Sequence, residues 1–186
     1  MIRTIQTLHD KVFRTLQWAA GDWFMGLAAR FVFSSVLLVY FLHSSMTKVG
    51  DGFPGFLVPK IGAYAQILPM IAEQADYDLS KIAFVPWGII VLFGTYAEFV
   101  LPILILLGLF TRFASLAMIV FIAVMSYVDV HYLGLKASDV GALFDRVHDS
   151  VIADQRLLWV LPLVYLAIHG GGAISLDRLL PRVMRR

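Results

Sequence analysis

An acidic side chain lies near the middle of a long apolar run that covers residues 84–113. About 20 apolar residues at a rise of ~1.5 Å each cross the ~30 Å hydrocarbon layer, so this run can span a bilayer. The acid is Glu98, and a carboxylate at that depth costs roughly 2.5–3.5 kcal/mol. We therefore expect Glu98 to face a protein interior or a wet cavity and to have a partner. Pro102 has no N–H to donate to the carbonyl of Glu98, which leaves a second oxygen of that residue without its helical donor.

An inner group of polar residues is predicted near one end of the spans. It contains Glu98, Arg30 near the start of the first apolar run, and the i, i+4 pair Tyr165 and His169 near the end of the last. Arg30 and Glu98 differ in depth by ~6 Å at helical rise, which a guanidinium can bridge. Such an ion pair could bind a quinone head group or a small anion, or Glu98 could take part in proton movement. Alternatively, the pair only fixes helix packing, and Arg30 extends to the surface.

An outer group is predicted near the opposite ends of the spans and consists of His43, Lys48, Asp129 and His131. Histidine and aspartate are ligands for Zn, Fe or Cu. However, the Asp-x-His spacing places the two side chains about 200° apart on a regular helix. We therefore interpret these residues as interfacial hydrogen-bonding groups and predict no metal site.

The composition is that of an integral membrane protein. Of 186 residues, 60% are hydrophobic, and the mean hydropathy is +0.80. The net charge of +2 gives no indication of nucleic-acid binding. Absence of cysteine excludes a disulfide, a thiolate metal site and a thiol–disulfide relay carried by this chain alone.

We expect an all-α membrane protein, folded as one domain over residues 1–186 into a four-transmembrane-helix bundle. Short extracytoplasmic helices are expected within 60–74 and 138–147. An amphipathic helix at 1–22 is predicted to lie on the membrane surface, and 173–186 form a basic tail. The predicted spans cover about residues 27–46, 84–107, 113–130 and 157–172.

The charges of the flanking segments predict the orientation. The side that holds both termini carries eight basic and three acidic residues, and the opposite loops carry six basic and eight acidic ones. By the positive-inside rule both termini are cytoplasmic, and we expect the membrane to be a bacterial cytoplasmic (inner) membrane.

Three stretches together resemble the DoxX family of small four-helix membrane proteins. The first is Glu98 followed by an apolar run and a Gly-Leu-x-Thr-Arg sequence at 108–112. The others are Arg30 with Lys48 after it, and the glycine-rich sequence GGGAISLD at 170–177. The resemblance covers roughly residues 25–180. It implies a redox-associated membrane subunit, linked to thiosulfate:quinone oxidoreduction, to protection against oxidative stress or to maturation of secreted redox enzymes.

These observations favour a membrane subunit of a quinone-linked or oxidative-stress redox complex, with a quinone as the candidate cofactor. The expected partners are the lipid bilayer, a redox enzyme or other protein subunit, and further copies of the chain. No nucleotide, haem or nucleophile motif is present, so we do not expect catalysis by this chain alone, although it could be an oxidoreductase subunit. The alternatives are a small-molecule or proton-coupled carrier and a non-catalytic membrane scaffold.

Overall fold

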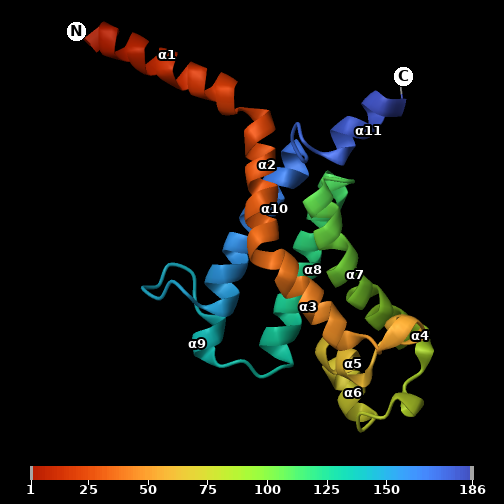
Figure 1. Ribbon diagram of the computed structural model, residues 1–186. Helices are drawn as coiled ribbons and strands as arrows, with labels where there is room; N and C mark the ends of the chain where they lie inside the picture. Colours follow the sequence, from red (N-terminus) through yellow and green to blue (C-terminus); the bar gives the residue numbers. More distant parts are fainter. Residues whose placement is uncertain (1, 185–186) are drawn as a thin grey trace.

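The computed structural model describes residues 2–184, and in this part of the chain every regular element is helical. Four helical segments are long and apolar enough to cross a membrane, which confirms the all-α four-span fold (Figure 1). They extend over Trp23–Lys48, Phe84–Leu107, Thr111–His131 and Val151–His169.

The first span is bent. It consists of α2 (Asp22–Phe33), a π-helical turn η1 (Ser34–Leu38) and α3 (Val39–Lys48). The change of direction at η1 is visible in Figure 1. Because of it, α2 packs against the fourth span while α3 packs against the second.

The second and third spans form a helical hairpin. The π-helical turn η3 (Phe84–Gly88) leads into α7 (Ile89–Leu107), and α8 (Thr111–His131) returns. Gly108 ends α7 with φ +66°. A Cβ atom there would lie 2.6 Å from Cβ of Ser175 and 2.9 Å from the guanidinium carbon of Arg30. Both the left-handed backbone and the close approach therefore require glycine.

The fourth span begins six residues before its predicted start and ends three before its predicted end. It comprises η4 (Val151–Gln155) and α10 (Arg156–His169). The early start has a local cause, since Ser150 and Asp154 cap the helix reciprocally: the Ser150 hydroxyl accepts from the Asp154 N–H at 3.2 Å, and the Asp154 carboxylate accepts from the Ser150 N–H at 3.0 Å.

Both termini lie at one end of the bundle and the two long loops at the other (Figure 1). At the terminal end, α1 (Ile2–Ala20) projects from the bundle with an exposed surface, and α11 (Leu176–Met184) follows the fourth span. The expected helix over 60–74 is divided at Leu68, and that over 138–147 is a single turn. The loop-end elements are α4 (Gly52–Phe56), α5 (Ile61–Ile67), α6 (Pro69–Gln74), η2 (Leu79–Lys81) and α9 (Ala137–Val140).

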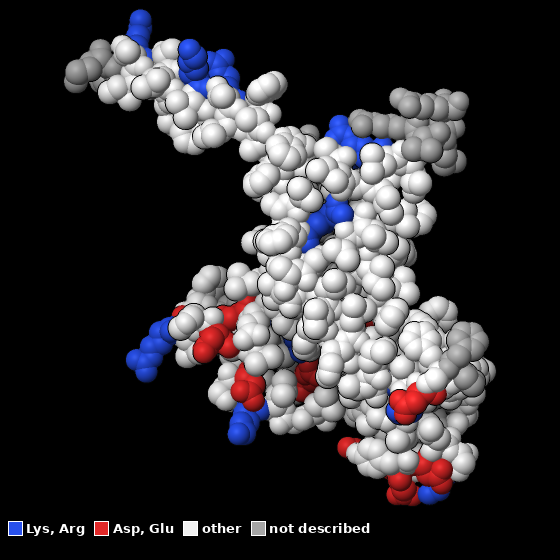
Figure 2. Space-filling model, in the orientation of Figure 1, with Lys and Arg blue, Asp and Glu red and all other residues white. Residues whose placement is uncertain are grey.

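Charge separates along the bundle axis. On the face shown in Figure 2, the terminal end carries lysine and arginine, and the acidic side chains gather around the loops. The core between these ends is apolar and takes side chains from all four spans. Its buried members are Phe33, Leu37, Phe41, Leu101, Ile105, Ala114, Met118, Ile122, Leu163 and Leu166.

The arrangement predicts that α1 and the 132–150 loop face opposite sides of the membrane. Because the native chain has no cysteine, Thr7→Cys and Ser138→Cys each introduce a unique label site at an exposed position. A membrane-impermeant maleimide should modify one of them in sealed membranes and the other only after permeabilisation. Equal labelling of both from the same side would contradict the number of crossings.

Candidate functional site

A buried ion pair joins the first and second spans. Nζ of Lys48, the last residue of α3, lies 2.7 Å from Oε2 of Glu98 in the middle of α7. Their side chains are only 2% and 5% exposed. The ammonium group also donates to the Ser44 hydroxyl at 2.7 Å and contacts the Ser44 carbonyl oxygen at 3.4 Å. Breaking such a buried pair by removing one partner leaves an uncompensated charge and is strongly destabilising.

The predicted pairing of Glu98 with Arg30 is wrong. Arg30 does not reach Glu98, because it lies beside the C-terminal turn of α7 and donates to the carbonyl oxygens of Ile105, at 3.0 Å, and Leu106. Ile105 is seven residues beyond Glu98, about 10 Å along the helix. The last carbonyls of a helix lack intrahelical donors, so the nearest acceptors for Arg30 are backbone oxygens rather than the carboxylate.

Arg30 also holds the glycine-rich segment that follows the fourth span. Its guanidinium donates to the carbonyl oxygens of Gly171, at 3.3 Å, and Ile174, at 2.6 Å. Gly26, one turn earlier in α2, packs so closely on this segment that a Cβ would lie 2.7 Å from the Gly172 nitrogen. Arg30 is therefore a buried cross-link between α2, the end of α7 and residues 171–174.

Asp177 fixes the other side of the same junction. Its carboxylate accepts hydrogen bonds from the Phe110 N–H at 2.6 Å, the Thr111 N–H at 2.8 Å and the Thr111 hydroxyl at 2.6 Å. Its own N–H donates to the Gly108 carbonyl oxygen at 2.9 Å. An acidic residue at the N-terminus of a helix satisfies free N–H groups and is favoured by the helix dipole. Asp177 thus closes the turn between α7 and α8.

The Lys48–Glu98 pair lines a cavity of about 590 Å³. Its walls are formed by α7 and α8, its back by α3 and its loop-side end by α5. Most of the lining is apolar, and small residues, Gly94, Ala97 and Ala117, leave the space between the helices. Exposed side chains on both walls, including Phe93 and Val124, place its rim on the outer surface of the bundle. Because its rim lies on the outer surface of the membrane-crossing helices, the cavity is accessible from the hydrocarbon layer.

A second charge pair, formed by the buried Arg156 and the half-buried Asp129, reaches the same cavity. Asp129 of α8 lines it and is bonded to Arg156 of α10, which also donates to the Ser126 hydroxyl at 2.8 Å. Arg156 lies 5.9 Å from the ring centre of Trp159. Tyr40 and Gln66 add polar groups to the lining. The cavity can therefore offer hydrogen-bond donors and acceptors at several points of an otherwise apolar surface.

The two polar groups expected from the sequence are divided differently in the structure. Of the outer group, Lys48 and Asp129 line the cavity with Glu98, whereas His43 is exposed and His131 stacks on Tyr127 with ring centres 4.3 Å apart. Among residues 2–184 there is no cluster of three His, Cys, Asp or Glu side chains able to hold a metal ion.

The remaining members of the inner group lie at the terminal end. Tyr165 and His169 stack with ring centres 4.4 Å apart, as an i, i+4 pair permits, and His169 is exposed. Neither residue lines the cavity that contains Glu98.

Three residues of these sites were not predicted from the sequence, namely Arg156, Tyr40 and Asp177. A signal for Arg156 was present: Asp129 lies at the end of an apolar run and needs a counter-charge, and Arg156 begins the next apolar run. Tyr40 carried no signal that distinguishes it from other interfacial aromatic residues.

Comparisons with protein-family models, with curated proteins and with solved structures found no match to this chain.

The buried pair predicts a charge-coupled stability pattern. Lys48→Met and Glu98→Gln should each lower the unfolding free energy by about 3–5 kcal/mol, because the remaining charge loses its partner in an apolar environment. The double variant should recover much of this loss. Thermal unfolding in detergent measures the series.

The exposed pair of Lys81 and Asp76, joined at 2.9 Å, provides the control. Lys81→Met and Asp76→Asn should cause much smaller losses, because water solvates the remaining partner. Additive losses at Lys48 and Glu98 would show that the two charges do not depend on each other.

Proposed function

We propose that this chain is a DoxX-like membrane subunit that binds the head group of a quinone, or of a similar lipid-soluble molecule, in the cavity between α7 and α8. In this role it connects a redox enzyme to the quinone pool of the membrane. The observation that carries the proposal is an apolar cavity at the lipid-facing surface with the Lys48–Glu98 pair in its lining. Ligand sites are commonly apolar pockets of roughly 300–1,000 Å³ with a few convergent polar groups.

The polar end of the cavity has the chemistry to recognise a carbonyl oxygen. An ammonium group has three donors, and those of Lys48 contact Glu98, the Ser44 hydroxyl and, at the longest distance of 3.4 Å, the Ser44 carbonyl. A ligand oxygen could replace that longest contact while the ion pair stays intact. The Glu98 carboxylate could then accept a proton from a quinol hydroxyl or, once it is itself protonated, donate one to a quinone oxygen.

Reduction of a quinone to a quinol requires two electrons and two protons. The chain has no cysteine and no motif for a haem or a flavin, so a partner enzyme would supply the electrons. The contribution of this chain is to bind and orient the head group and to provide a route for a proton through Glu98.

The residues that carry the resemblance to the DoxX family lie in contact with one another. All three stretches that carry the resemblance meet in the structure: Lys48 binds Glu98, Arg30 binds the glycine-rich segment, and Asp177 binds Thr111. Residues far apart in the sequence are thus joined in two local networks.

We further propose that both termini face the cytoplasm. The excess of basic residues at the terminal end and of acidic residues around the loops supports this orientation through the positive-inside rule.

The cavity can be filled without touching the charged residues. Ala117 lines it, whereas Ala123 on the same helix is exposed. Quinone that co-purifies with the protein should be lost in Ala117→Phe and retained in Ala123→Phe, as measured by solvent extraction and chromatography. A loss of about 1.4 kcal/mol of quinone-binding free energy in Ala117→Phe would lower the affinity about tenfold. Equal quinone content in both variants would exclude this cavity as the site.

The partner can be identified by affinity purification of the full chain from its native membrane in mild detergent, followed by mass spectrometry. A redox enzyme in constant ratio to the chain is expected, and its activity should fall in Ala117→Phe. If the enzyme co-purifies but its activity is unaffected, the chain is a scaffold. If no enzyme co-purifies and proteoliposomes show proton-dependent uptake, it is a carrier.

A further inference from the structure

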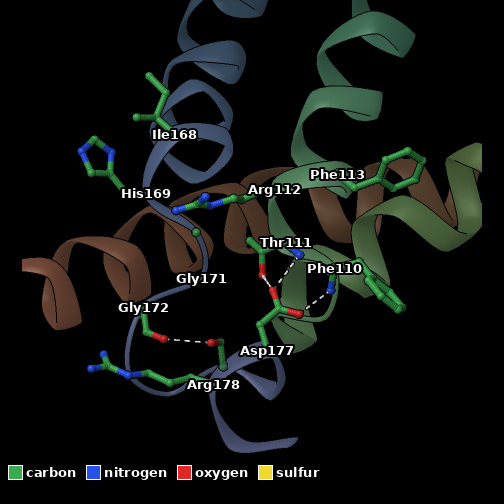
Figure 3. A pocket seen from close by; sticks show the side chains of 12 residues that line it. Phe110, Thr111, Arg112, Phe113, Ile168, His169, Gly171, Gly172, Asp177 and Arg178 are labelled. Atoms are coloured by element: carbon green, nitrogen blue, oxygen red, sulfur yellow. Dashed lines mark hydrogen bonds between the residues drawn. The ribbon is translucent and has the colours of Figure 1, made fainter. Parts of the chain in front are cut away.

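A second cavity lies at the terminal end of the bundle. It measures about 750 Å³ and is bounded by the end of α10, the glycine segment 170–172, the start of α8 and the start of α11 (Figure 3). It shares only Phe113 with the lining of the quinone-site cavity. A ligand in this cavity would therefore be independent of the quinone site proposed above.

Basic side chains dominate the polar lining. Arg112, Arg178 and His169 all contribute, and Figure 3 shows them along one side of the site, with the phenyl rings of Phe110 and Phe113 on the other. Within the described part of the chain, neither Arg112 nor Arg178 forms an ion pair or a side-chain hydrogen bond. Their donors are thus available for a ligand.

The acidic residue of this lining does not neutralise the arginines. Asp177 is directed to the Phe110 and Thr111 N–H groups and the Thr111 hydroxyl, so its oxygens serve the turn before α8 (Figure 3). The two guanidinium groups and this one carboxylate leave a net positive charge at the cavity. An anion is the ligand that such a site favours.

The rim of the cavity is apolar and faces outward. Phe110, Phe113 and Ile168 are 66%, 69% and 62% exposed. They lie where two membrane-crossing helices end, α8 at its start and α10 at its last turn. This is the depth at which lipid head groups meet acyl chains, and aromatic and aliphatic side chains beside arginines suit both parts of a phospholipid.

We propose that this terminal-end cavity binds a phosphate group, held by Arg112 and Arg178, and that its source is the head group of an anionic phospholipid. Guanidinium groups bind phosphate oxygens through paired hydrogen bonds. Arg112 lies beside the glycine segment, because a Cβ on Gly170 would be in ordinary van der Waals contact, at 3.6 Å, with Nε of Arg112. The exposed rim favours a lipid over a soluble phosphate, because a soluble ligand has no acyl chain to cover these side chains.

Native mass spectrometry of the full chain in detergent tests this proposal with phosphatidylglycerol, phosphatidylcholine and glycerol 3-phosphate as probes. The wild type should retain phosphatidylglycerol in preference to phosphatidylcholine. Arg112→Gln and Arg178→Gln should each reduce that preference by roughly fivefold, as expected for removing one nearby basic charge. Both arginines are exposed, so the variants should fold, which thermal unfolding checks.

Arg14→Gln is the matched control, because Arg14 lies on α1 at the same end of the molecule but outside the cavity. It should leave the preference unchanged. If all three variants had an equal effect, general surface charge would explain the binding and the proposal would be overturned. Equal retention of phosphatidylglycerol and phosphatidylcholine by the wild type would also overturn it. Displacement of phosphatidylglycerol by glycerol 3-phosphate at equal concentration would keep the phosphate site but assign it to a soluble ligand.

Discussion

The high cost of an unpaired charge in the hydrocarbon layer is the constraint on which the rest of this structure depends. Four charged residues lie buried or half-buried in the spans with charged partners, as Lys48 with Glu98 and Asp129 with Arg156. The first pair joins α3 to α7, and the second joins α8 to α10. Each pair therefore fixes the rotation and depth of two helices, in an environment where hydrophobic burial cannot do so.

At the terminal end of the bundle, the charged side chains have backbone groups as their partners. Arg30 is buried, and within the described part of the chain its guanidinium is hydrogen-bonded to carbonyl oxygens at the end of α7 and in the glycine segment rather than to a carboxylate. Asp177 uses N–H groups at the start of α8. Helix ends supply free acceptors and donors, so the charged groups and the helix termini satisfy one another. The hairpin of α7 and α8 is held closed by residues far from it in the sequence.

The number of spans was predictable because length and apolar character are local properties of the sequence. The same holds for Glu98 as a residue in need of a partner. The identity of that partner was not predictable, since it depends on how far the first span and α7 are shifted along each other. The bend at η1 also affects which residue meets Glu98. It was not predictable either, because residues 34–38 contain neither proline nor glycine to signal it. The predicted fourth span starts at about residue 157 and so excludes Arg156, because the reciprocal cap of Ser150 and Asp154 that begins the helix earlier has no clear signal in the sequence.

Some residues that line the cavity also stabilise the fold. Variants of these residues give no clear information about function. Lys48 and Glu98 both line the cavity and hold α3 against α7, so replacing either changes packing and any bound ligand together. A loss of activity in those variants has two explanations. Ala117 lines the cavity and belongs to neither ion pair, so its substitution fills the volume available to a ligand and leaves both pairs in place. The distinction between a scaffold and a binding subunit therefore rests on the apolar wall of the cavity and not on the ion pair that first draws attention in the sequence.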